Sequence, residues 1–336
     1  MAVSIEDVAR AAGVSTATVS RALRGLPHVT PSTRAAVQAI ADELGYTASP
    51  SASALASGRT RTVGLVVPAI SRWFFAECVE GAEVTLRAAG FDALLYSLPD
   101  TARPRGPFDA AVLRRRVDAV LVASMSFSAG ETAALRSLGV PAVFVSVPQE
   151  GFAHVGIDDL AGAVAATRHL VGLGHRVIAH IGGGRHDAPS SPTARRRAGW
   201  RQVLAEAGLE HGADLDAEAD FTAEDGARVT AALLDRRPDL TAVFAASDEM
   251  AMGALRTVRE RGLEPGRDVS VIGFDGHTLG SVLGLTTIAQ SAHDQGSRAA
   301  EYLLDVLAGA PDNAPTALFP TELVVRQSTG PVPVGS

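Results

Sequence analysis

The chain has 336 residues, of which 46% are hydrophobic and 20% are charged, and its formal net charge is −7. This length allows two or three domains with sizeable cores, and the single cysteine, Cys78, excludes both an intrachain disulfide framework and a cysteine-cluster metal site. The first residues carry acids where a signal peptide needs a basic start, and no apolar run approaches the ~18 residues of a membrane span, so we expect a cytoplasmic protein.

The charge is divided unevenly along the chain. Residues 1–61 contain six arginines and four acids, a local charge of +2, so the remaining residues carry −9. A mildly basic segment on an acidic body is typical of a protein in which only that segment binds DNA.

Three helices are predicted within residues 1–46. Ser4 and Asp7 have the spacing of a capping box, and Gly13 ends the helix that they open. Ser15 caps a second helix over residues 16–23, and Thr30-Pro31 opens a third, which Gly45 ends. The apolar positions expected to face the core of this head are Val14, Val19, Leu23, Val37, Ile40, Ala41 and Leu44.

The second helix has a small, polar, arginine-bearing outer face. Ala17, Ser20, Arg21 and Arg24 fall at helical spacing on that face. A plain three-helix bundle would fit the apolar pattern equally well. The outer face instead favours a helix-turn-helix unit, because a helix in the major groove needs small side chains for approach and arginine for guanine.

The segment SIEDVARAAGVSTATVSRAL resembles the N-terminal signature of the lactose-repressor (LacI/GalR) family of transcriptional regulators. The resemblance implies that base edges are read by Thr16, Ala17 and Arg21. It also implies that phosphates are contacted by Ser15, Thr18, Ser20, Thr30, Thr33 and Tyr46, which position the head without reading sequence.

Residues 47–60 are rich in Ser, Ala, Thr and Gly and form the predicted hinge. Composition alone is consistent with a flexible linker. In the family this segment folds on operator DNA and wedges a leucine into the minor groove, and Leu55 matches that leucine. The chain departs from the family pattern at Ser53, where an arginine is common.

From residue 62 onward, short apolar runs alternate with helical stretches. Buried strands are predicted at 63–69, 92–98, 119–124, 142–147, 177–183, 242–247 and 269–274, and helices at 75–90, 160–174 and 250–263. This alternation predicts two doubly wound parallel sheets, with ligands bound beyond the carboxyl ends of the strands.

Several stretches of the body are also similar to the same family, among them AVFAASDEMAMGALR and VSVIGFDG. The resemblance implies a periplasmic-binding-protein-like body with an effector cleft between two lobes. We expect a helix-turn-helix domain over 1–46 and the hinge over 47–60. The N-terminal lobe is expected over 61–158 and 291–319, the C-terminal lobe over 159–290 and 320–330, and a tail over 331–336. The chain would cross between the lobes near Asp158, Gln290 and Pro320.

The resemblance also proposes the effector-binding residues. The run Arg195–Arg197 could be a solvated face, but the family's effector-binding arginine stands three residues before a glycine, which selects Arg196. Asp248 and Asp275 each follow a strand, although Asp248 could instead belong to a helix cap, as could Ser247. Phe74 and Phe221 match ligand-packing positions and could also be core. The complete expected set is Ala69, Phe74, Ser146, Arg196, Phe221, Ser247, Asp248, Asp275 and Gln290.

Departures from the sugar-binding members of the family narrow the expected effector. Those relatives usually carry Asp at position 146, Asn at 247 and often Asp at 69, where this chain has Ser146, Ser247 and Ala69. Arg72 and Trp73 replace the usual Asn-Pro, adding charge and apolar surface near the expected cleft mouth. A sugar derivative with fewer free hydroxyls, or an anionic or glycosidic one, fits these changes better than a neutral hexose.

The expected function is therefore a homodimeric regulator that binds a palindromic operator and a small effector. No heptad follows the last strand, so we expect a dimer rather than a coiled-coil tetramer. No catalytic triad or metal-ligand spacing is visible, and we expect no cofactor and no enzyme activity. The alternatives are a solute-binding protein of the same body fold and a corepressor-activated regulator that binds a nucleobase-like ligand.

Overall fold

The computed structural model describes residues 3–46, 59–98, 108–183, 189–332. The chain divides into two compact units, a head that ends at Arg61 and a body that begins at Thr62. Among the described residues, none of the helices combines the length and the apolarity that crossing a membrane would require.

The head consists of three helices, α1 (Ile5–Ala12), α2 (Thr16–Leu23) and α3 (Pro31–Leu44). Each helix begins where the sequence predicts, because Ser4, Ser15 and Thr30 accept the backbone N–H three residues later. Val8, Val19 and Val37 are buried at the centre of the bundle. Leu44 was predicted to face this core and does not; it is 39% exposed, because it lies in the last turn of α3 beyond the edge of the small bundle.

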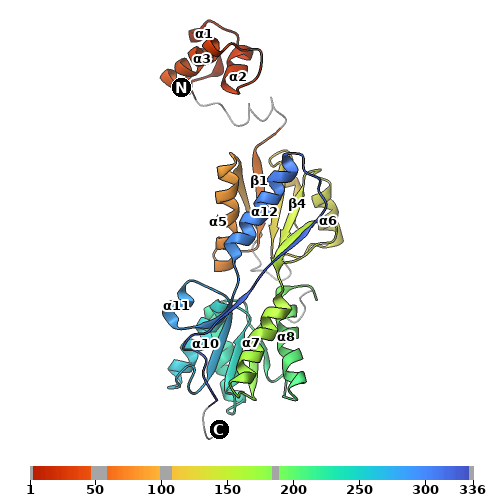
Figure 1. Ribbon diagram of the computed structural model, residues 1–336, viewed down its shortest axis with the longest axis vertical. Coiled ribbons are helices and arrows are strands. Elements are labelled where there is room, and N and C mark those ends of the chain that lie inside the picture. Colours follow the sequence, from red (N-terminus) through yellow and green to blue (C-terminus); the bar gives the residue numbers. More distant parts are fainter. Residues whose placement is uncertain (1–2, 47–58, 99–107, 184–188, 333–336) are drawn as a thin grey trace. The chain divides into compact units, whose positions relative to one another are not determined.

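The described residues of the body form two sheets of six strands each, and several of the elements are labelled in Figure 1. The first, which defines the N lobe, has the order β11-β5-β4-β3-β1-β2 and is parallel throughout. Its strands are β1 (Thr62–Val67), β2 (Asp92–Ser97), β3 (Ala119–Ala123), β4 (Ala142–Val145), β5 (Ala153–Ile157) and β11 (Thr316–Phe319).

Helices cover both faces of the N-lobe sheet. Alternate residues of β1 face opposite sides: Leu65 packs with α5 (Trp73–Ala88) and α12 (Ala292–Leu307), and Val66 packs with α6 (Ala129–Arg136) and η1 (Ala110–Leu113). Helices α5 and α12 lie side by side (Figure 1) and meet backbone to backbone, since a Cβ added at Gly296 would lie 1.9 Å from the Cys78 carbonyl oxygen.

The second sheet defines the C lobe and has the order β12-β10-β9-β8-β6-β7, with only the edge strand β12 antiparallel to its neighbour. Its strands are β6 (Ile178–Gly182), β7 (Asp216–Glu218), β8 (Ala242–Ala245), β9 (Ser270–Asp275), β10 (Thr286–Ala289) and β12 (Glu322–Val324). Its helices are α7 (Asp159–Gly172), α8 (Pro192–Glu206), α9 (Ala223–Arg236), α10 (Asp248–Glu260) and α11 (Leu279–Leu283). Trp200, Phe244 and Phe274 are fully buried in the C-lobe core.

The predicted fold class is confirmed: a helical head precedes a body of two doubly wound sheets. Sheet membership changes three times along the body, between β5 and α7, between β10 and α12, and between β11 and β12. Parallel sheets place the carboxyl ends of their strands at one edge, where ligands bind in such folds.

Two features of the sheets differ from the prediction. Residues 92–97 form a strand but not a buried one, because β2 is an edge strand and Leu95 is 41% exposed. The strands β5, β7, β10 and β11 were not predicted, because β7 and β11 are sheet edges and the other two mix polar residues into short runs. The last strand was predicted near Val324 and Val325, where the structure has β12.

Candidate functional site

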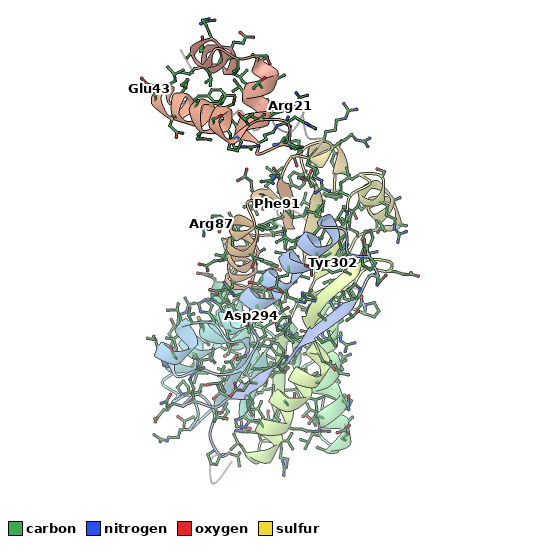
Figure 2. The ribbon with its side chains drawn as sticks, turned by 45° about the horizontal axis from the view of Figure 1, so that its top comes forward. Arg21, Glu43, Arg87, Phe91, Asp294 and Tyr302 are labelled. Atoms are coloured by element: carbon green, nitrogen blue, oxygen red, sulfur yellow. The ribbon has the colours of Figure 1, made fainter. Side chains whose placement is uncertain are left out.

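The outer surface of α2 forms the first candidate site. Thr16, Ala17 and Arg21, which were predicted to read base edges, are all exposed. Figure 2 shows Arg21 and the acidic Glu43 at opposite ends of the head. The side chains predicted to read bases are therefore all accessible on α2.

The starts of α2 and α3 suit phosphate groups. Neither helix has an acid in its first turn, whereas α1 has two. Ser15 Oγ lies 2.9 Å from Thr18 Oγ1, and Thr30 Oγ1 lies 2.8 Å from Thr33 Oγ1, so each start carries a pair of hydroxyls at the positive end of its helix. Such positive helix ends bind anions.

The remaining predicted DNA contacts are divided between the described and the undescribed residues. Ser20 is half-buried on α2. Tyr46 packs against the head's core, and its N–H donates to Ala41 O at 2.8 Å, which closes α3. Leu55 and hinge residues 47–58 lie outside the described residues.

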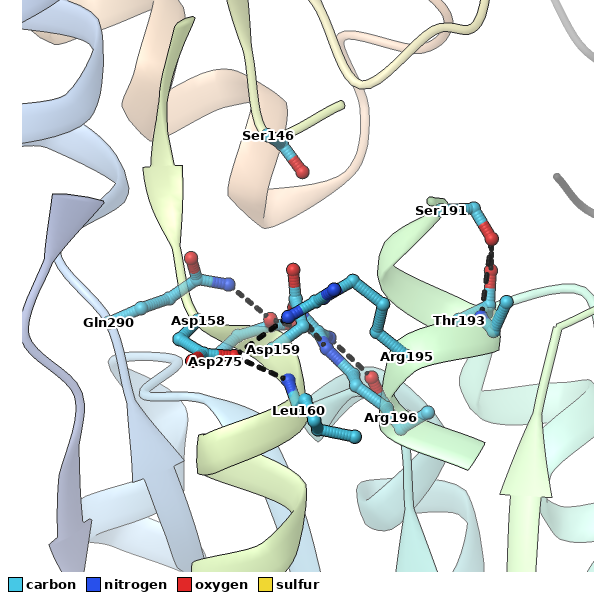
Figure 3. A network of polar contacts seen from close by, with 12 residues as sticks. Ser146, Asp158, Asp159, Leu160, Ser191, Thr193, Arg195, Arg196, Asp275 and Gln290 are labelled. Carbon is cyan, nitrogen blue, oxygen red and sulfur yellow. Dashed lines mark hydrogen bonds and ion pairs between the residues drawn. The ribbon is translucent and has the colours of Figure 1, made fainter. Parts of the chain in front are cut away.

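The second candidate site is a buried polar network at the carboxyl ends of the C-lobe strands (Figure 3). Arg196 is its centre: Nε donates to Asp159 Oδ1 at 2.8 Å, and Nη1 donates to Ala246 O at 2.6 Å and to Asp275 Oδ1 at 3.3 Å. Its guanidinium also lies 3.7 Å from the centre of the Phe274 ring. A buried guanidinium held by two carboxylates and an aromatic face has a fixed position.

The network extends from Asp275 toward the N lobe. Gln290 Nε2 donates to Asp275 Oδ1 at 2.8 Å, and Gln295 Nε2 donates to Gln290 Oε1 at 3.0 Å. Burial raises the pKa of the Asp275 carboxyl to about 6, although Arg196 and Gln290 favour its charged form. The charged form of Asp275 is therefore destabilised in a site that sequence analysis assigned to the effector.

The three consecutive arginines have three different environments. Arg195 forms a half-exposed ion pair with Asp158 at 3.0 Å, which fits the solvated-face alternative. Arg196 and Arg197 are buried, and Arg197 instead donates to Asp216 and to the Gly183 carbonyl. Only Arg196 reaches the polar network.

Backbone strain gathers around the same region. Ser124, Ser146, Phe221 and Asp275 have positive φ angles of 50°, 72°, 58° and 122°. Each lies at, or within three residues of, the carboxyl end of a strand, namely β3, β4, β7 and β9. A non-glycine residue in such a conformation costs roughly 1–3 kcal/mol, and such residues cluster at ligand sites.

Three of the other predicted residues belong to the N lobe. Ser146 lies across from the network, with its hydroxyl directed toward it (Figure 3). Ala69 follows β1 and is half-buried, and Phe74 lies in the first turn of α5, edge-to-face with Phe75 at 5.5 Å between ring centres. On the C-lobe side, Phe221 is half-buried and lies beside Gly183 and Thr193.

Two predicted site residues have structural contacts instead. Ser247 Oγ accepts the Met250 N–H and caps α10, as the cap alternative predicted. Asp248 has no exposed surface, and its oxygens accept from Thr287 Oγ1 at 2.7 Å, Gly276 N at 2.9 Å and His277 N at 2.7 Å. The side chain of Asp248 therefore fixes the loop after β9 by hydrogen bonds, and we do not include it in the proposed effector site.

Sequence analysis missed Asp159, Ser124 and Thr193. Asp159 is buried and directly follows the first chain crossing, but a second acid beside a capping Asp158 gives no signal of its own. Thr193 forms a polar pair with Ser191 at the start of α8, 3.2 Å between hydroxyl oxygens, shown at the right of Figure 3.

Comparison with known proteins gives two family matches. The family described as bacterial regulatory proteins, lacI family, matches residues 4–49, and the periplasmic binding protein-like domain matches residues 167–329. The HTH-type transcriptional regulator CelR of Thermobifida fusca is 35% identical, covering 97% of this chain and 98% of its own.

Several solved structures are similar over nearly the whole chain, among them the following two. The Lac repressor dimer bound to operator and the anti-inducer ONPF has a TM-score of 0.85 and 28% identity, covering 98% of this chain and 100% of its own. The transcriptional regulator CelR–cellobiose complex has a TM-score of 0.70 and 32% identity, covering 97% of this chain and 99% of its own.

Proposed function

Because this chain belongs to the lacI family of bacterial regulatory proteins, and is thus a DNA-binding transcriptional regulator rather than an enzyme, we propose that it is a cytoplasmic repressor controlled by a sugar derivative. The effector binds between the N and C lobes and changes the affinity of the head for a palindromic operator. These are two coupled sites, so the effector must bind the two states of the protein with different affinity.

The observation that carries the DNA-binding part is the exposed face of α2, with Arg21 in its last turn. Arg21 pairs with a guanine, and the hydroxyl-bearing starts of α2 and α3 receive phosphates on either side. Two heads are needed for a palindrome. A homodimer is supported by the operator-bound dimer of the Lac repressor and by the exposed apolar Leu279 and Val282 of α11, which are 53% and 80% exposed.

The observation that carries the effector part is the network around Arg196. Arg196 and Gln290 both donate to Oδ1 of Asp275. Within the described part of the chain, Oδ2 is therefore left to accept a ligand hydroxyl. Ser146 supplies a single hydroxyl contact from the opposite lobe (Figure 3). Phe74 and Phe221 provide apolar faces for a ring.

This set offers fewer carboxylates than a neutral hexose needs for its neighbouring hydroxyl pairs. Ala69 offers no polar atom and Ser146 offers one rotatable hydroxyl, where a carboxylate would offer two oxygens. Arg72 and Trp73 add charge and apolar surface. A glycosidic or anionic sugar derivative therefore fits the site best. The similar CelR structure holds cellobiose, a glycosidic sugar.

The experiment is a calorimetric titration of the full chain with cellobiose, glucose, ribose, glucose 6-phosphate and hypoxanthine. We expect a disaccharide or sugar phosphate to bind and D275A to abolish binding, whereas D235A, which changes an exposed ion-paired carboxylate of the C lobe, keeps it. Operators selected from random duplexes then show in gel shifts whether the ligand releases DNA. Binding of glucose alone would contradict the ligand class, and binding of hypoxanthine that tightens DNA would support the corepressor alternative.

A further inference from the structure

Arg72, which precedes α5 in the N lobe, reaches across to the C lobe. Its Nη2 donates to the Asp220 carbonyl oxygen, and its Nη1 lies 3.8 Å from Glu249 Oε2 at the start of α10. The guanidinium also lies 5.9 Å from the centre of the Phe221 ring. One N-lobe side chain thus contacts two separate C-lobe segments, the loop after β7 and the first turn of α10.

Trp73 adds a third C-lobe segment. Its backbone N–H donates to Glu249 Oε1 at 3.3 Å, and its ring stacks on His277 with 5.3 Å between ring centres and 28° between planes. His277 is held in place because Asp248 accepts the backbone N–H groups of Gly276 and His277. The buried Asp248 carboxylate therefore positions the surface on which Trp73 rests.

These contacts are more enclosed than an ordinary surface ion pair. The side chains of Arg72 and Glu249 are 28% and 25% exposed, whereas those of Arg87 and Glu83, an ion pair within α5, are 70% and 41% exposed. A less solvated pair is screened less by water and salt. Water and salt therefore screen Arg72–Glu249 less than they screen Arg87–Glu83, although the Arg72–Glu249 distance of 3.8 Å is longer than the 3.1 Å of the other pair.

The contacts also contain an opposing contribution. Arg72 Nη1 and Trp73 Nε1 are enclosed, and neither has a hydrogen-bond acceptor among the described residues. An enclosed donor without an acceptor favours exposure to water. The arrangement in which Arg72 and Trp73 contact the C lobe is thus stabilised by several contacts and destabilised by two donors that have no acceptor among the described residues.

We propose that Arg72 and Trp73, together with Asp220, Glu249 and His277, form an interlobe latch that keeps the body closed before any effector binds. The latch sets the free-energy difference between the closed and open arrangements of the lobes. An effector then increases or decreases this difference, which exists before the effector binds. The latch is a property of the body alone, and its test requires neither operator nor effector.

The test uses the full chain labelled with 5-fluorotryptophan and ¹⁹F NMR. The sequence has two tryptophans, so the spectrum has one signal for Trp73 in the latch and one for Trp200, which is fully buried in the C-lobe core. The variant W73F assigns the signals. The Trp200 signal reports in every variant that the C lobe is folded.

In the parent we expect a Trp73 signal that is shielded from solvent, with a small solvent-isotope shift. In the double variant R72A/E249Q the closed population should fall about tenfold relative to the open one, the change that ~1.4 kcal/mol produces. Trp73 should then show a second or shifted, solvent-exposed signal. R87A removes the Arg87–Glu83 ion pair on the same helix and should leave Trp73 unchanged.

If R72A/E249Q fails to fold, as judged by Trp200, the milder variants R72Q and E249Q are measured separately, and each should shift Trp73 part of the way. An unchanged Trp73 signal in folded R72A/E249Q, or in both single variants, would overturn the latch. An equal change in R87A would also overturn it, because the effect would then belong to α5 and not to the interlobe contacts.

Discussion

Replacing Asp275 with asparagine is expected to stabilise the folded body at neutral pH, although it removes a residue of the proposed effector site. Asp275 is held by Arg196 and Gln290 through Oδ1, and an asparagine oxygen can accept the same two bonds. The change therefore removes the ionisable proton and retains the shape of the network.

The magnitude follows from the pKa. Burial raises the pKa of Asp275 from 3.8 to about 6, so the charged form is disfavoured on folding by roughly 3 kcal/mol. Because the folded pKa is raised, the stability that protonated Asp275 contributes is present below pH 3.8 and is lost as the pH rises through 6. An asparagine at position 275 has no ionisable proton, so the stability of D275N does not fall in this way. The stability of D275N minus that of the parent should therefore grow by ~2 kcal/mol between pH 4 and pH 7.

The assay is urea unfolding at one fixed protein concentration and at pH 4, 5, 6 and 7, followed by tryptophan fluorescence. D235N is the matched control, because Asp235 is an exposed surface acid whose pKa is lowered by Arg261. Parallel pH profiles for D275N and the parent would refute the reasoning. So would a parent that is more stable than D275N at pH 7, which would mean that the ion pair with Arg196 outweighs burial.

Three further predictions concern DNA and assembly. R21A should weaken specific operator binding in gel shifts by about 1–3 kcal/mol and relax one base position, whereas R10A on α1 should not; equal effects would remove Arg21 from base reading. L55A should reduce operator bending, measured by energy transfer between duplex ends, and leave effector binding intact; undiminished bending would make the hinge a plain tether. V282D should dissociate the dimer in sedimentation; a persistent dimer would place the interface elsewhere than α11.

The head could be predicted almost completely because its signals are local. Ser4, Ser15 and Thr30 cap the first turns of their own helices, so the sequence within four residues decides where each helix begins. The exposure of Leu44 could not be predicted in the same way, since it depends on how far the bundle extends.

The effector site could be predicted only in part because its contacts are distant in sequence. Arg196, Asp275 and Gln290, which the family resemblance implied, are in contact. Asp159, which accepts a hydrogen bond from Arg196, lies 37 residues earlier, just after the first crossing between the lobes. Asp248 was assigned to the ligand because it follows a strand and matches a ligand-contacting position of the family. Its three donors come from residues 276, 277 and 287, and no local pattern indicates that they enclose it.

The three changes of sheet along the body have a consequence for biosynthesis. β11 and β12 are separated by two residues near the end of the chain, yet each completes a different sheet at its edge. Neither lobe can therefore finish folding on the ribosome until translation has passed β11 and β12. A nonsense mutation between residues 310 and 316 would remove both strands and so damage both lobes at once, whereas one at residue 321 would remove β12 and leave the N-lobe sheet with all six of its strands.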